Sequence, residues 1–178
     1  LSEQLLWEHA IGCGVAAKQI GEADGFPAIE EAYLAGLMHD VGKAALFLRA
    51  PSQMREIMQE VYNNQNANFA DLEQQKLGFD HAEVGQIMAD EWRFSIDIED
   101  AIAHHHHPDQ SKSSSELSYI VSLANSLCHK LEIGPTRRPD IDLLKLGSVK
   151  ALGLNAESLS KVVEKVSGML KEEKIEGI

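Results

Sequence analysis

The sequence predicts an all-α fold, a bundle of many helices with a short helical extension at the C-terminal end. Three observations predict it. Apolar residues recur at three- and four-residue steps through nearly all of the 178 residues. No segment alternates polar and apolar residues between turns as a strand would, and no internal repeat is visible. A hydrophobic fraction of 44% and a charged fraction of 25% are ordinary for a folded domain and exclude disorder for most of the chain.

In the first half of the chain, the apolar steps predict a helix over residues 5–20, before the turn-forming residues 25–27. A second helix is expected over 28–40, with acidic residues in its first turn, where the helix dipole favours them. A third, over 52–63, follows a proline start signal, and a fourth resumes at residue 69 and ends at Gly78.

In the second half, Asp80 is a suitable N-cap for a helix over 81–92. The clearest amphipathic pattern covers 117–131, and a short helix is expected within 143–154. Asn155 can cap the last helix. We interpret residues 1–133 as the core domain, lacking an N-terminal part because the chain opens on Leu1 inside a helical pattern, and 134–178 as an extension packed on it.

Composition restricts the possible partners. With 16 Lys and Arg against 28 Asp and Glu, the formal charge is −12, which argues against a surface for nucleic acid or anionic lipid. No apolar run approaches the roughly 20 residues that span a bilayer, and no signal segment opens the chain. Only Cys13 and Cys128 are present, so a disulfide framework is not expected and a cytoplasmic location is the default.

Several polar features stand apart from helix packing and point to metal chemistry. Neutral imidazole and carboxylate together suit Fe, Mn, Zn and similar ions, and on an ideal helix neighbouring His39 and Asp40 could both reach a cavity inside the bundle. Not all four histidines of 104–107 can point inward, so we expect His105 and His106 to do so and His104 and His107 to be exposed. The candidate residues are His9, His39, Asp40, Lys43, His81, His105, His106 and Asn125.

Each of these residues also has a purely structural interpretation. His9 could fill a helix interface, Asp40 could bond backbone amides at a helix end, and His81 could serve only the cap beside it. Asn125 could be a buried hydrogen-bonding partner rather than a ligand.

The string GLMHDVGK at residues 36–43 resembles the signature of the HD superfamily of metal-dependent phosphohydrolases. Four blocks in this order more closely resemble the HDOD domain, the HD-related output domain of bacterial signalling proteins. They are WEH at 7–9, GLMHDVGK at 36–43, DHAEVG at 80–85 followed by Trp92, and IAHHHHP at 102–108. The helix YIVSLAN at 119–125 completes the resemblance, which covers residues 5–131 and implies an HD-type bundle.

The resemblance implies metal-ligand positions at His9, His39, Asp40, His81, His105 and His106. It also implies a lysine, Lys43, that lies near a substrate phosphate in catalytic relatives. Asn125 aligns with the aspartate that closes the site in those relatives, and its neutral carbonyl is a weaker ligand than a carboxylate. The chain also lacks the Gly-Tyr-Pro motif of the HD-type cyclic-di-GMP phosphodiesterases, so that activity is not expected.

Two functions follow as hypotheses, beside a third alternative of a purely structural helical bundle without metal. The first is a signal-transduction output domain that binds other signalling domains or proteins and has a degenerate or partial metal site. The second is a metal-dependent phosphohydrolase acting on a phosphate-containing small molecule, in which Asp40 and Lys43 would be the catalytic residues.

Overall fold

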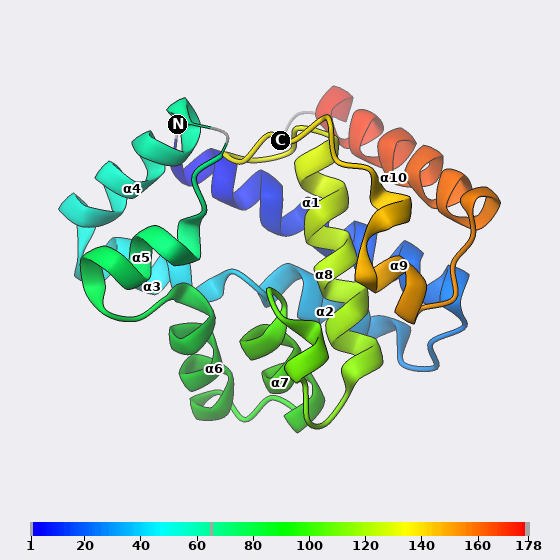
Figure 1. Cartoon of the computed structure of the whole chain (residues 1–178), viewed down its shortest axis with the longest axis horizontal. Coiled ribbons are helices and arrows are strands. Elements are labelled where there is room, and N and C mark those ends of the chain that lie inside the picture. The colour runs from blue at the N-terminus through cyan, green and yellow to red at the C-terminus, as the bar shows by residue number, and fades with distance from the viewer. Residues whose placement is uncertain (1, 65, 177–178) are drawn as a thin grey trace.

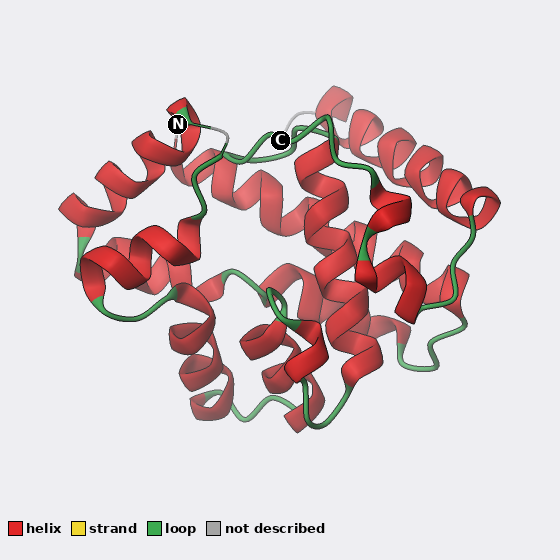
Figure 2. Ribbon diagram, viewed as in Figure 1, coloured by secondary structure: helices red, strands yellow, loops and turns green. Residues whose placement is uncertain are grey.

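The computed structural model describes residues 2–64 and 66–176, and throughout that part of the chain the regular secondary structure is helical (Figure 2). The all-α prediction is therefore confirmed. The α-helices are α1 (Ser2–Asp24), α2 (Ile29–Met38), α3 (Val41–Arg49), α4 (Pro51–Asn63), α5 (Phe69–Leu77), α6 (His81–Glu91), α7 (Ile96–His104), α8 (Ser115–Lys130), α9 (Gly147–Ala151) and α10 (Ala156–Glu176). Short 3₁₀ turns occupy Pro108–Gln110 and Leu143–Lys145.

Helix α8 runs through the middle of the molecule and packs against α1, α2, α7 and α9 (Figure 1). Helices α3, α4 and α5 form a separate lobe on one side, and α10 lies along α1 on the other. The pair α6 and α7 connects the lobe to the central helices, since α6 contacts α3 as well as α7. Within the described ranges, no helix is long and apolar enough to cross a membrane.

Two apolar clusters match this division. The larger one is built on α1, α2, α7, α8, α9 and α10, and Ile20, Ile102, Leu123 and Leu127 are fully buried in it. The smaller one belongs to α3, α4 and α5 and consists of Leu46, Met54, Ile57, Met58, Val61 and Phe69.

The predicted helix boundaries that depend on local capping are confirmed. Asp80 accepts hydrogen bonds from the backbone N–H groups of Ala82 and Glu83 in the first turn of α6 and forms a capping box with Glu83. Gly78 ends α5 in the left-handed conformation that glycine adopts at low cost. Asn155 accepts a hydrogen bond from the backbone N–H of Ser158 at the start of α10.

One boundary prediction is wrong. The expected helix over 28–40 ends at Met38, and a helix that the pattern did not indicate, α3, begins at Val41. His39 and Asp40 therefore lie in a turn between two helices and not on one helical face. This turn lies where the two apolar clusters approach each other, because α2 packs in the larger one and α3 in the smaller.

Candidate metal centre

The predicted histidines meet around the carboxylate of Asp40. Its Oδ1 atom lies 3.1 Å from His81 Nε2 and 3.8 Å from His105 Nε2. Its Oδ2 atom lies 3.5 Å from His39 Nε2 and 3.7 Å from His9 Nε2. All five side chains are buried. The structure therefore brings together residues from α1, the α2–α3 turn, the start of α6 and the end of α7.

Each of these four imidazoles is held by a hydrogen bond from its other nitrogen, Nδ1, to a backbone carbonyl or, for His81, to the side chain of Glu73. The partners are Ile133 O for His9 at 3.0 Å, Gly36 O for His39 at 2.7 Å, the Glu73 carboxylate for His81 at 2.5 Å and Ile102 O for His105 at 2.7 Å. A proton on Nδ1 leaves the Nε2 lone pair free to face Asp40. Metal-binding histidines are oriented in this way in most proteins.

Close contacts between helices bring the α2–α3 turn, which carries Asp40, near the histidines of α1 and α6. A Cβ atom on Gly36 would lie 2.5 Å from the carbonyl oxygen of Cys13 in α1. A Cβ atom on Gly42 would lie 2.0 Å from the carbonyl oxygen of His81 in α6. Both distances are shorter than real Cβ contacts, so glycine at these two positions lets α2 approach α1 and α3 approach α6. The turn carrying Asp40 is thereby held between both helices.

Three of the four consecutive histidines lie as predicted, and His104 does not. His105 is buried, and His106 is partly buried with its Nε2 atom 3.0 Å from that of His81. His107 is exposed, as expected. His104, expected to be exposed, is half-buried, and its Nδ1 donates to the carbonyl oxygen of Asp100 at 2.9 Å. All six residues for which a ligand position was predicted thus lie in one cluster.

Lys43 is buried beside the same carboxylate. Its Nζ atom donates to Asp40 Oδ2 at 2.7 Å and lies 4.4 Å from the centre of the Phe69 ring. Burial raises the pKa of Asp40, but His39, Lys43 and His81 outweigh it and hold that pKa well below its usual value. Asp40 is therefore ionised at neutral pH.

Asn125 of α8 is buried next to His9 and acts to raise the pKa of that imidazole, against the larger lowering caused by burial. The position is consistent with the alignment to a closing aspartate, but the residue brings no negative charge. The role of Asn125 as a weak ligand stays a prediction.

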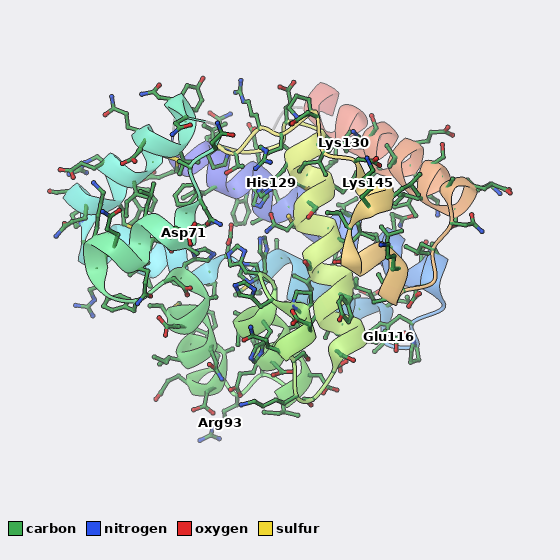
Figure 3. The ribbon with its side chains drawn as sticks, viewed as in Figure 1. Asp71, Arg93, Glu116, His129, Lys130 and Lys145 are labelled. Carbon is green, nitrogen blue, oxygen red and sulfur yellow. The ribbon has the colours of Figure 1, made fainter. Side chains whose placement is uncertain are left out.

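Sequence reasoning missed three residues of the cluster. Glu73 of α5 is fully buried and accepts hydrogen bonds from both the ring and the backbone N–H of His81. His129 of α8, labelled in Figure 3, stacks on His9 with ring centroids 5.2 Å apart. Cys13 lies one turn after His9 on α1, with its Sγ atom 3.5 Å from His9 Nε2. Only the spacing of His9 and Cys13 could have been found in the sequence, because residues four apart share a helix face.

Burial keeps most of the imidazoles neutral. It lowers the pKa of His39 to about 4 and that of His106 to about 2. Burial also lowers the pKa values of His9, His105 and His129. His81 differs: burial and Lys43 lower its pKa, but Asp40 and Glu73 outweigh them and raise it.

The interior therefore contains acceptors that face one another. His39 Nε2 has no hydrogen-bond partner among the described residues, and Asp40 Oδ1 has His81 Nε2 as its nearest contact at 3.1 Å. Buried acceptors without partners are costly, and a shared cation removes that cost. Neutral imidazoles around one carboxylate are donors that suit a divalent transition metal, so the residues present fit such an ion.

The family model of the HDOD domain matches residues 1–108, and the chain belongs to this family. An HDOD domain protein of unknown function from Geobacter sulfurreducens is 25% identical, with a TM-score of 0.75 over 99% of this chain and 61% of its own. A candidate phosphohydrolase from Shewanella amazonensis is 20% identical, with a TM-score of 0.70 over 92% of this chain and 58% of its own. A candidate signal transduction protein from Marinobacter aquaeolei is 17% identical, with a TM-score of 0.82 over 93% of this chain and 37% of its own.

The resemblance drawn from the sequence motifs is therefore confirmed at the level of the family. The chain spans less than two thirds of the length of each of these three proteins. No curated protein matches the sequence significantly.

Proposed function

We propose that this chain is the output domain of a bacterial signalling protein and that its buried cluster binds a divalent transition metal. The observation that carries the metal proposal is the common orientation of four imidazoles. Each has Nδ1 anchored on an oxygen and Nε2 directed at Asp40. The signalling proposal is supported by the family and by the similarity in fold to a candidate signal transduction protein.

In this proposal His9, His39, Asp40, His81, His105 and His106 hold the metal, and Fe, Mn and Zn are the ions that suit these donors. Asn125 takes a lesser part next to His9. The ion would link α1, α6 and the α2–α3 turn, so its binding would stabilise the packing of the α3–α5 lobe against the central helices. Such a linkage suits a signalling domain, because metal binding would then alter the surface that the domain offers to its partners.

Metal content of the purified, chelator-free protein is the first test. We expect at least one transition-metal ion for each chain. Asp40→Asn should weaken metal binding, measured by competition with a coloured chelator, by about 100-fold, because loss of a ligand costs at least as much as loss of an outer partner.

His107→Asn is the matched control, since His107 belongs to the same run of histidines but is exposed. It should leave the affinity unchanged. Absence of bound metal, or equal affinities for the Asp40 and His107 variants, would contradict the metal proposal.

A second candidate function, metal-dependent phosphohydrolysis, is favoured by one observation. Lys43 places a buried ammonium 2.7 Å from Asp40, where it could neutralise charge on a phosphate oxygen. A bound divalent ion would polarise a phosphoryl oxygen in such a reaction. One observation opposes this candidate. A substrate needs an accessible coordination position, but the main donors are all buried: His39, Asp40, His81 and His105.

Turnover separates the two candidates. The metal-loaded protein is incubated with phosphodiester and nucleotide substrates, with Mn, Fe or Mg added. We expect no hydrolysis. Hydrolysis that disappears in Asp40→Ala would replace the regulatory proposal with the enzymatic one.

A further inference from the structure

The donors around Asp40 form two halves of different chemistry. His81 and His105 lie on the Oδ1 side, and with His106 they form a group of three imidazoles whose ligand atoms all lie within 4.8 Å of one another. We call this the three-histidine half. His9 and His39 lie on the Oδ2 side, and with Cys13 they form a second group whose ligand atoms lie within 4.8 Å of one another. We call this the cysteine half. A third such group, His39, Asp40 and His105, joins the two.

We propose that Cys13 is a metal ligand and that the cysteine half is a site for a thiophilic ion such as Zn²⁺, with His9, His39 and Asp40 as the other donors. This inference rests on the proposed metal function and extends it. It adds a sulfur ligand, which is absent from the sequence motifs that predicted the histidine and aspartate ligands.

The spacing of the donor atoms supports a tetrahedral site. Zinc–nitrogen bonds of about 2.0 Å and zinc–sulfur bonds of about 2.3 Å place neighbouring ligand atoms of a tetrahedron roughly 3.3–3.6 Å apart. His9 Nε2 lies 3.5 Å from Cys13 Sγ, and Asp40 Oδ2 lies 3.5 Å from His39 Nε2 and 3.7 Å from His9 Nε2. Three of the six edges of the tetrahedron therefore already have nearly the required length, and the two edges from His39 to His9 and Cys13 are within 4.8 Å.

The surroundings hold these donors in place. His9 and Cys13 are four residues apart on α1 and both buried, so they present their ligand atoms on one helix face. The Nδ1 atoms of His9 and His39 are already bonded to backbone carbonyls, which directs their Nε2 atoms to the site.

Charge also favours this assignment. A thiolate at Cys13 together with the Asp40 carboxylate would bring two negative charges to a buried site that would hold the two positive charges of the ion and the ammonium of Lys43. Lys43 donates to the same Oδ2 atom at 2.7 Å, but a carboxylate oxygen has a second lone pair available for a metal.

The three-histidine half lacks sulfur, so the two halves should differ in preference. A thiolate selects Zn²⁺ and related soft or borderline ions over Mg²⁺ and Ca²⁺. Cys128 supplies a natural comparison: it is buried and free and contacts Cys13, but it belongs to neither group of donors.

Cobalt substitution tests the assignment with a readout independent of any activity. The full chain is stripped of metal and loaded with Co²⁺, and absorption is recorded in the near ultraviolet, where thiolate-to-cobalt charge transfer is intense. We expect the band in the wild type and in Cys128→Ser, and its loss in Cys13→Ser. We also expect Cys13→Ser to bind zinc about 100-fold more weakly or worse.

The wild type alone provides a second measurement that does not depend on the folding of a variant. X-ray absorption at the zinc edge should show one sulfur at about 2.3 Å. Three results would overturn the assignment of Cys13 while leaving the metal function intact. They are cobalt binding without the charge-transfer band, loss of the band in Cys128→Ser instead of Cys13→Ser, and a zinc shell of only nitrogen and oxygen. Failure of the wild type to bind any ion would instead contradict the proposed function itself.

Discussion

Lowering the pH should destabilise the metal-free protein, because its fold buries neutral histidines. In the unfolded chain these groups have their ordinary pKa of 6.5, whereas burial lowers the pKa of His39 to about 4 and that of His106 to about 2. The folded state then binds fewer protons than the unfolded state below pH 6.5. The stability that comes from keeping these histidines neutral is therefore fully present above that pH, and it is lost as the pH falls toward their pKa values in the folded state.

The magnitude follows from linkage. At pH 5.5 an unfolded histidine is about 90% protonated while folded His39 and His106 remain neutral, which costs between about 1 and 2 kcal/mol for each residue and about 3 kcal/mol together. His9, His105 and His129 change stability in the same direction. The pKa of His81 is raised, so this residue opposes the loss in part. A loss of about 3 kcal/mol is a large part of the roughly 5–15 kcal/mol that stabilises a typical domain.

Urea unfolding followed by circular dichroism, at pH 7.5 and pH 5.5 with a chelator present, measures this difference. His39→Asn should reduce the difference by about 1 kcal/mol relative to the wild type, because it removes one of the neutral buried imidazoles. His107→Asn, at an exposed position of the same run of histidines, should leave the difference unchanged. Equal or greater stability at pH 5.5 in the wild type would refute the reasoning.

Three further predictions concern the neighbours of the site. Glu73→Gln should weaken metal binding about 10–100-fold in chelator competition, because the carboxylate that orients His81 is lost; an unchanged affinity would show that His81 is not a ligand. Asn125→Asp should tighten metal binding by about tenfold in the same assay, since it adds an anionic donor next to His9, and no change would place residue 125 outside the site. Gly42→Ala should lower the melting temperature by about 6–12 °C, because its Cβ would lie 2.0 Å from the His81 carbonyl oxygen. Gly168→Ala, in an exposed part of α10 with nothing within 4 Å, should be neutral or stabilising, and similar losses in both variants would refute the close contact.

The sequence was sufficient for features that depend on neighbouring residues. Periodicity predicted the all-α fold, and cap residues such as Asp80 and Asn155 marked helix starts that the structure contains. The histidines stood out because imidazoles are rare and chemically distinctive. Glu73 could not be found in this way, because α5 carries many polar residues and its pattern does not show which of them is buried.

The partners that orient the histidines were equally inaccessible. Ile133 and Ile102 act through their backbone carbonyls, so their side chains carry no trace of this role. His129 meets His9 only because α1 and α8 pack together, across more than one hundred residues of sequence. Such contacts depend on the tertiary fold and leave no local pattern.

The incorrect helix boundary shows how the site depends on the fold. An uninterrupted helix through Asp40 would use the Gly36 carbonyl to accept the backbone N–H of Asp40, four residues later. Because α2 ends at Met38, that carbonyl is free to accept Nδ1–H of His39, the residue that follows the helix. His105 repeats the arrangement at the end of α7, bonding the carbonyl of Ile102 three residues earlier. Ending each helix at this point both satisfies a terminal carbonyl and directs an Nε2 lone pair toward Asp40, so the break that periodicity did not predict is part of how the site is built.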